Sequence, residues 1–111
     1  MADDCLFCKI VSGGIPAKIA YQDESCVAFH DINPQAPVHV LVIPREHCSS
    51  VAECPASLAA PVLAAVQQVA RDLGIEDGYR VVTNRGPDAG QTVYHLHWHV
   101  LGGRKFGWPP G

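Results

Sequence analysis

Three histidines alternate with apolar residues near the C-terminal end of the 111-residue chain, in the run His95-Leu96-His97-Trp98-His99. Successive side chains of a β-strand point to opposite faces, so a strand here would present all three imidazoles on one face. Neighbouring histidines on that face would lie roughly 7 Å apart. The polar face of a half-exposed strand explains one histidine better than three in strict alternation. The spacing therefore indicates a site where several imidazoles act on one chemical group.

Two kinds of chemistry fit such a face. His-x-His on a strand is a ligand spacing of open catalytic zinc sites. Alternatively, a neutral imidazole attacks phosphorus while its neighbours stabilise the phosphoryl oxygens. The upstream segment favours phosphorus, because Gly90, Gln91 and Thr92 offer backbone N–H groups and a hydroxyl that suit a phosphate, and Asn84 adds an amide. A hydrolytic zinc site usually needs a carboxylate base, and Asp88 is the nearest one.

Helix and strand signals predict how these residues are positioned. The clearest helix covers residues 57–73 and carries one apolar stripe, formed by Leu58, Val62, Val66, Val69 and Leu73. Because proline is tolerated only in the first turn of a helix, the regular helix should begin near Pro61. A short helix is expected over residues 5–12, capped by Asp4 and stopped by Gly13.

Five strands are expected, over residues 19–22, 26–30, 38–43, 79–83 and 93–101. Together these elements predict an α+β fold: a five-stranded, mostly antiparallel sheet with one long and one short helix. The length fits a single domain over residues 1–111.

Composition excludes several classes of function. The net charge is −3 and the basic residues are scattered, which argues against nucleic acid and anionic membranes as partners. No apolar run approaches the length of a membrane span. The acidic start, residues 1–4, does not look like a signal peptide, and five is an odd number of cysteines. A cytoplasmic protein with reduced thiols is the simplest interpretation, with Cys26, Cys48 and Cys54 as ordinary free thiols.

Motifs along nearly the whole chain resemble those of histidine triad (HIT) proteins. The matching segments are residues 6–10, 15–18, 28–37, 39–47 and 90–94, followed by the three alternating histidines. The C-terminal motifs Gly102-Gly103-Arg104 and Trp108-Pro109-Pro110-Gly111 are typical of the Hint branch, the histidine triad nucleotide-binding proteins. The combination is highly specific, whereas a lone His-x-His-x-His would not be.

The resemblance implies hydrolysis of purine nucleoside phosphoramidates of the AMP or GMP type. His97 matches the nucleophile, which would form a nucleotidyl-histidine intermediate. His99 matches the residue that contacts the phosphoryl oxygens or the leaving group, and His39 a supporting histidine. Asp31 matches the residue that holds the ribose hydroxyls, and His95 the first triad position, which is usually structural. The phosphate and leaving-group side is expected to comprise Asn84, Gly90, Gln91 and Thr92, where Thr92 replaces a common serine.

The apolar pocket for the base is expected to comprise Phe7, Ile10, Ile15, Phe29, Ile32 and Leu41. Burial in the core explains these six almost as well. His30 could touch the nucleoside, but a structural role is preferred for it.

The pair Cys5 and Cys8 is a separate candidate site. A closed tetrahedral zinc site needs two more ligands, and the resemblance to zinc-containing HIT proteins points to His47 and His95. Such a site would be structural and would fasten the N-terminal helix to the sheet. The alternative is a pair of buried free thiols.

The resemblance also implies a homodimer, with the sheet extended across two copies and Trp108 beside the partner's pocket. A large aromatic side chain in a proline-restricted tail also favours a docked position over free solvent. Three alternative functions stay open. They are a nucleotide-binding regulatory module without turnover, a zinc hydrolase with the triad as ligands, and a dinucleoside polyphosphate hydrolase or nucleotidyltransferase of a sister HIT branch.

Overall fold

The computed structural model describes residues 4–111, so the expectation of no signal peptide rests mainly on residues outside it. The first half contains α1 (Leu6–Val11), β1 (Ile19–Gln22), β2 (Cys26–His30) and β3 (Val38–Pro44). The second half contains a 3-10 turn η1 (Ala56–Leu58), α2 (Ala59–Asp72), β4 (Tyr79–Val82), a 3-10 turn η2 (Pro87–Ala89) and β5 (Trp98–Gly102).

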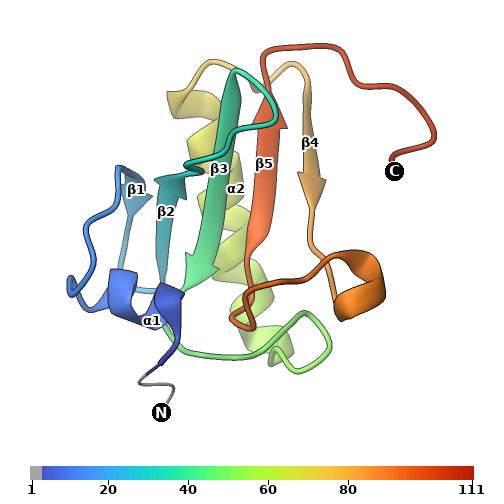
Figure 1. Cartoon of the computed structure of the whole chain (residues 1–111). Helices are drawn as coiled ribbons and strands as arrows, with labels where there is room; N and C mark the ends of the chain where they lie inside the picture. The colour runs from blue at the N-terminus through green and yellow to red at the C-terminus, as the bar shows by residue number, and fades with distance from the viewer. Residues whose placement is uncertain (1–3) are drawn as a thin grey trace.

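The strands form one antiparallel sheet in the order β1-β2-β3-β5-β4, which confirms the predicted fold class. In Figure 1 the long helix α2 lies behind the sheet and the short helix α1 lies in front of it, near the lower ends of β1 and β2. The central strand β3 pairs with β2 on one side and β5 on the other. Side chains of β3 and β5 therefore alternate between the α2 face and the α1 face.

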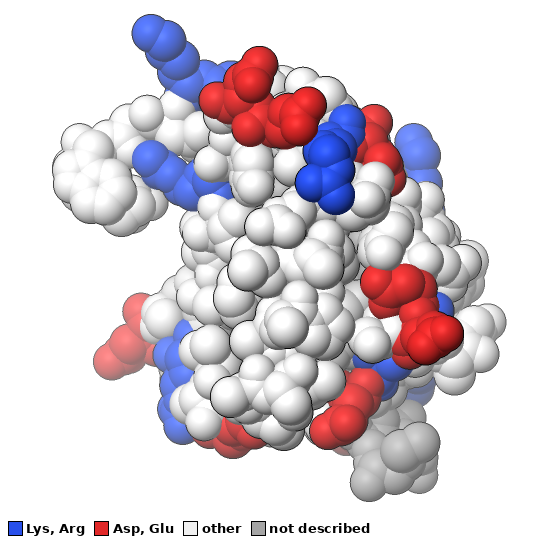
Figure 2. All heavy atoms as spheres, turned by 180° about the vertical axis from the view of Figure 1, so that it is seen from behind, with Lys and Arg blue, Asp and Glu red and all other residues white. Residues whose placement is uncertain are grey.

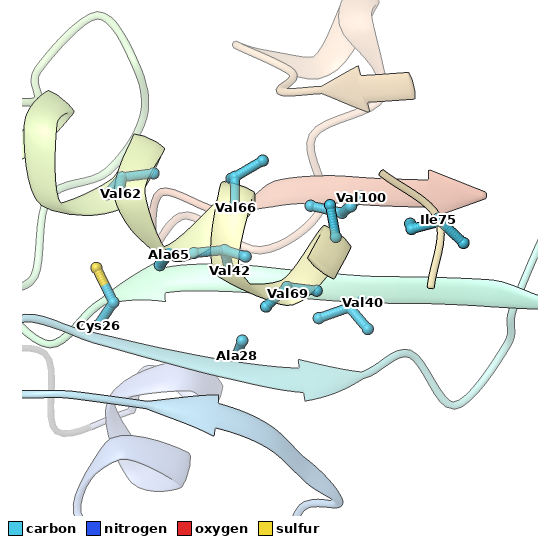
Figure 3. Close-up of a cluster of buried hydrophobic side chains, with 11 residues drawn as sticks. Cys26, Ala28, Val40, Val42, Val62, Ala65, Val66, Val69, Ile75 and Val100 are labelled. Carbon is cyan, nitrogen blue, oxygen red and sulfur yellow. The ribbon is translucent and has the colours of Figure 1, made fainter. Parts of the chain in front are cut away.

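The α2 face holds the larger core. The stripe residues Val62, Val66 and Val69 are buried, as the helical period predicts, and they pack against the sheet residues Val40 and Val100 (Figure 3). Burying each such valine contributes about 1.5–3 kcal/mol. Leu58 and Leu73, at the two ends of the stripe, are half-buried.

Pro61 is the third residue of α2, as its placement in the first turn requires. The predicted helix of residues 57–73 is divided, because its first residues belong to the 3-10 turn η1.

The α1 face holds a second core, in which Phe7 packs with Phe29 and Leu41. The cap of α1 differs from the expected one. Cys5, rather than Asp4, occupies the N-cap, and its Sγ accepts a hydrogen bond from the backbone N–H of Cys8 (3.3 Å). A helix of six residues is too short to be stable alone, so α1 depends on what its side chains contact.

The histidine strand begins later than predicted, at Trp98 instead of residue 93. The ladder between β3 and β5 starts at the pair Val42–Trp98. Two steps further along β3 stands Pro44, which has no N–H to donate. Leu96 N–H donates instead to the carbonyl of Cys48 (2.7 Å). His95 and His97 therefore precede the strand, and only His99 lies on it.

The middle of the outer surface of α2 is largely uncharged. Seen from behind in Figure 2, acidic and basic side chains gather at the ends and edges, while the central band carries almost none. Leu63 of α2 and Val81 of the edge strand β4 are both exposed. Within the described part of the chain, no helix is both long and apolar enough to cross a membrane.

Candidate functional site

A cavity of about 470 Å³ opens on the α1 side of the sheet. Its apolar wall includes all six residues predicted for the base pocket: Phe7, Ile10, Ile15, Phe29, Ile32 and Leu41. Three of these, Phe7, Phe29 and Leu41, are also buried in the core of that face. Ile32 lies at the mouth of the cavity with its side chain fully exposed.

The same cavity is lined by the polar side chains of Asp31, Thr92, His97 and His99. The rings of His97 and His99 lie 5.1 Å apart between centroids, closer than the spacing expected along an ideal strand. Two imidazoles, a hydroxyl and a carboxylate thus border one apolar space. This arrangement suits a ligand with an apolar ring system at one end and a polar or charged group at the other.

His97 is held by its surroundings in one orientation. Its Nδ1 lies 2.8 Å from the carbonyl oxygen of His95. Because a carbonyl only accepts, Nδ1 carries the proton, and Nε2 of the neutral ring keeps a free lone pair. Phe7 packs edge-on against the ring (5.1 Å between centroids), and Thr83 donates a hydrogen bond to the His97 carbonyl (3.0 Å). A fixed imidazole with a free Nε2 is what a nucleophile at phosphorus needs.

His39 does not line the cavity but lies directly behind His99. Its Nε2 is 2.8 Å from Nδ1 of His99 and 3.4 Å from a carboxylate oxygen of Asp31. The backbone N–H of Gln35 donates to Nδ1 of His39 (3.0 Å). Burial lowers the pKa of His39, and burial together with the neighbouring histidines His97 and His39 lowers the pKa of His99 to about 4. Both rings are therefore neutral at pH 7.

Four of the predicted substrate-binding residues lie outside this cavity. The side-chain amide of Gln91 bonds to the backbone of Gly86, Ser49 and Val93 and thereby fastens its own loop. Gly90 caps η2 with a left-handed backbone (φ 91°), a conformation that favours glycine. Asn84 is half-buried, and Trp108 in the C-terminal tail is 83% exposed. Their contacts with substrate stay predictions.

The second predicted cluster is also assembled. The four ligand atoms of Cys5, Cys8, His47 and His95 all lie within 4.8 Å of one another. Sγ of Cys8 is 3.2 Å from Nδ1 of His47 and 3.4 Å from Nδ1 of His95, and the two Nδ1 atoms are 3.2 Å apart. With bonds of about 2.3 Å to sulfur and 2.0 Å to nitrogen, a tetrahedral zinc ion separates its ligand atoms by roughly these distances.

The hydrogen bonding of His95 also fits a metal ligand. Its Nε2 lies 2.9 Å from the carbonyl oxygen of Pro44, so Nε2 is protonated and Nδ1 offers its lone pair to the cluster. Burial raises the pKa of the Cys8 thiol to about 11, with Cys5 contributing, so a thiolate here requires a neighbouring cation. The donor set, two sulfurs and two imidazoles, is one that zinc prefers.

The family model described as "HIT domain" matches residues 12–106 of the chain. This protein belongs to the HIT family. The match includes the histidine run and most of the cavity wall, whereas Cys5 and Cys8 precede it.

Similar proteins support this assignment over nearly the whole chain. A HIT family hydrolase from Clostridium thermocellum is 50% identical, with 96% of each chain covered and a TM-score of 0.92. A histidine triad nucleotide-binding protein from Candida albicans is 32% identical, with a TM-score of 0.84 over 95% of this chain and 82% of its own. A 14 kDa zinc-binding protein from Zea mays is 45% identical over 96% of this chain and 87% of its own.

Some residues of the site in this HIT protein were not identified from the sequence. Lys18 and His30 line the cavity, whereas the sequence indicates no role for Lys18 and favours a structural one for His30. Gln35 contacts His39 through its backbone N–H. A backbone donor has no side-chain signature, so only the folded structure reveals it.

Proposed function

We propose that this HIT protein is a purine nucleoside phosphoramidase of the Hint branch. It cleaves the phosphorus–nitrogen bond of a nucleoside phosphoramidate and releases a nucleoside monophosphate. The observation that carries the proposal is the state of His97. Its Nδ1–H is engaged with the His95 carbonyl, and the residue lines the cavity, so Nε2 is the ring nitrogen available as a nucleophile.

The reaction proceeds in two displacements. Nε2 of His97 attacks the α-phosphorus, the phosphorus–nitrogen bond breaks, and the amine departs after its nitrogen takes up a proton. Water then attacks the phosphorus of the nucleotidyl-histidine, which releases the monophosphate and restores neutral His97. His99 and Thr92 border the phosphoryl group, where hydrogen-bond donors stabilise the charge that develops on its oxygens.

The rest of the cavity accommodates the nucleoside. The apolar wall formed by Phe7, Ile10 and Phe29 receives the purine, because a flat ring system buries well against aromatic and aliphatic side chains. The Asp31 carboxylate accepts hydrogen bonds from the ribose hydroxyls. The similarity to the Clostridium thermocellum hydrolase and to the Candida albicans nucleotide-binding protein supports this arrangement.

A turnover assay tests the proposal, with adenosine phosphoramidate and a dinucleoside polyphosphate compared side by side. Hydrolysis of the phosphoramidate, with nucleotide trapped on the protein after rapid acid quench, is the expected result. Preferential cleavage of the polyphosphate would place the protein in a sister branch. Tight AMP binding without any turnover would leave a nucleotide-binding regulatory module.

We further propose that the cluster of Cys5, Cys8, His47 and His95 holds one structural zinc ion. The distances and donor set described above support it, as does the similarity to the maize zinc-binding protein. Zinc here joins α1 to the segment before β5, and α1 is too short to be stable by itself. The chemistry of His97 does not use the metal, so this role is one of stability.

We also propose a two-fold homodimer through α2 and β4. The exposed side chains of Leu63 and Val81 and the uncharged band in Figure 2 support an interface there, and β4 lies at the edge of the sheet. The C-terminal tail starts on the same side, because Arg80 of β4 donates to the carbonyl of Gly107 (2.8 Å). Trp108 would then reach the leaving-group side of the partner's cavity.

A further inference from the structure

The hydrogen bonds behind the cavity bear on which ring nitrogen of His99 carries its proton. The chain of contacts starts at the backbone N–H of Gln35, which can only donate. It lies 3.0 Å from Nδ1 of His39, so this nitrogen must accept and cannot carry a proton. Since the buried His39 ring is neutral, its single ring proton is on Nε2.

The protonation of His39 in turn determines that of His99. The protonated Nε2 of His39 lies 2.8 Å from Nδ1 of His99, which must therefore accept. His99 is neutral at pH 7, so its own proton is on Nε2, the nitrogen on the far side of the ring from His39. The opposite tautomer of His99 would force a proton onto Nδ1 of His39, directly against the Gln35 N–H, and the hydrogen bond from Gln35 would be lost.

Asp31 reinforces this arrangement from the side. Its carboxylate oxygen lies 3.4 Å from Nε2 of His39, which makes it a second, weaker acceptor for the same proton. His39 is only 5% exposed, so water does not compete for these contacts. Asp31 and His99 thus both accept from Nε2–H of His39, and the directed chain of hydrogen bonds runs from Gln35 through His39 to His99.

We propose that the Gln35 backbone N–H, acting through His39, fixes neutral His99 in the tautomer that presents Nε2–H to the cavity, so that His39 is a positioning residue. This inference rests on the proposed function for its catalytic consequence. A His99 N–H attracts a phosphoryl oxygen, whereas the lone pair of the other tautomer repels it. Donors that are oriented before the reaction stabilise the developing charge most.

Nitrogen-15 NMR of the histidine rings in the full-length protein at pH 7 tests the tautomer without any substrate. His99, assigned by comparison with a His99→Gln variant, should be protonated at Nε2 and unprotonated at Nδ1. A proton on Nδ1 of His99 in the wild-type protein would overturn the proposal.

Substitutions of His39 test the positioning role. His39→Leu removes the donor, so the spectrum should show mixed His99 tautomers and kcat for adenosine phosphoramidate should fall about 10- to 100-fold, with little change in KM. His39→Gln keeps a side-chain N–H in this place and should restore most of kcat. Equal rates for the two variants, or an unchanged kcat in His39→Leu, would contradict the proposal.

A pair of changes at Gln35 tests the origin of the chain. Gln35→Pro removes the backbone N–H and should alter the tautomers of both His39 and His99, whereas Gln35→Ala keeps the N–H and should leave them unchanged. No spectral difference between these two variants would overturn the proposal. Failure of the proposed function is distinguishable: the predicted tautomer without phosphoramidate hydrolysis would refute only the activity, and hydrolysis with the opposite tautomer only this inference.

Discussion

Two clusters on the same face of the sheet are built from similar residues and differ in what they can do. In each cluster the potential metal-binding atoms lie within 4.8 Å of one another: Cys5, Cys8, His47 and His95 in one, Asp31, His39 and His99 in the other. In the first, Nδ1 of His47 and Nδ1 of His95 lie 3.2 Å apart, and both lie within 3.4 Å of Sγ of Cys8. In the second, Nε2 of His39 and Nδ1 of His99 face each other across a hydrogen bond of 2.8 Å.

The difference comes from the backbone behind each histidine. The carbonyl of Pro44 accepts a hydrogen bond from Nε2–H of His95, which leaves the Nδ1 lone pair free for a cation. The N–H of Gln35 donates to Nδ1 of His39, so the ring proton of His39 is on Nε2 and points toward His99. A backbone acceptor thus prepares a metal ligand, and a backbone donor prepares a hydrogen-bond donor. Residue types and mutual distances do not by themselves distinguish the two.

The largest effect is expected at His97, which lies between the clusters. His97→Ala should reduce phosphoramidate hydrolysis at least about 1000-fold, because the covalent bond to phosphorus can no longer form. AMP binding, measured by calorimetry, should survive, since contacts to the base and ribose act in the ground state. Turnover near the wild-type rate would end the covalent mechanism.

Zinc should belong to the first cluster only. Elemental analysis of untagged protein should give one zinc per chain, and Cys8→Ser or a chelator should remove it and lower the stability by several kcal/mol. Cys54 is a half-buried thiol outside the cluster, so Cys54→Ser is the matched control. This variant should keep both the zinc and the melting temperature. His99→Gln should also keep the zinc. Protein that contains no zinc even after growth with added zinc would refute the site.

Acid should act on the second cluster through His99, whose pKa in the folded protein is about 4 against 6.5 in the unfolded chain. The unfolded state binds more protons in this range, so stability is fully present above pH 6.5 and is lost as the pH falls toward 4. The total contribution is roughly 3 kcal/mol at most. In urea denaturation at pH 7 and pH 5, wild-type protein should lose more stability than His99→Gln. Identical losses would show that His99 is not buried in its neutral form.

The smallest effect is expected from shortening the C-terminal tail, which belongs to neither cluster. The proposed dimer itself should appear in light scattering as twice the chain mass of 11.9 kDa. Deletion of residues 106–111 should alter the preference among amine leaving groups several-fold and leave nucleoside affinity nearly unchanged. Lys105→Ala serves as the control. A monomer, or a truncated protein with the same leaving-group profile, would contradict the dimer proposal.

Periodic features of the fold were predictable from the sequence. The stripe containing Val62, Val66 and Val69 repeats with the helical period, and its burial follows. The candidate cavity was predictable from the resemblance, since all six apolar residues assigned to the base pocket line it.

Features that depend on one backbone group were not predictable. The start of β5 depends on the missing N–H of Pro44, about fifty residues away along the chain. The cap of α1 depends on a cysteine sulfur where the sequence offered a better-known capping residue in Asp4. The direction of the His39–His99 hydrogen bond depends on the Gln35 N–H. Each is set by the arrangement in space and leaves no pattern in residue types.

The two clusters are interleaved along the chain, and this has a thermodynamic consequence. In α1 and its cap, Cys5 and Cys8 face His95, while Phe7 between them packs against His97. Zinc and a bound nucleotide would therefore hold the same short helix from two sides. By linkage, whatever factor zinc adds to nucleotide affinity, the nucleotide adds to zinc affinity. If the two ligands stabilise α1 together, zinc should bind nucleotide-saturated protein more tightly than free protein.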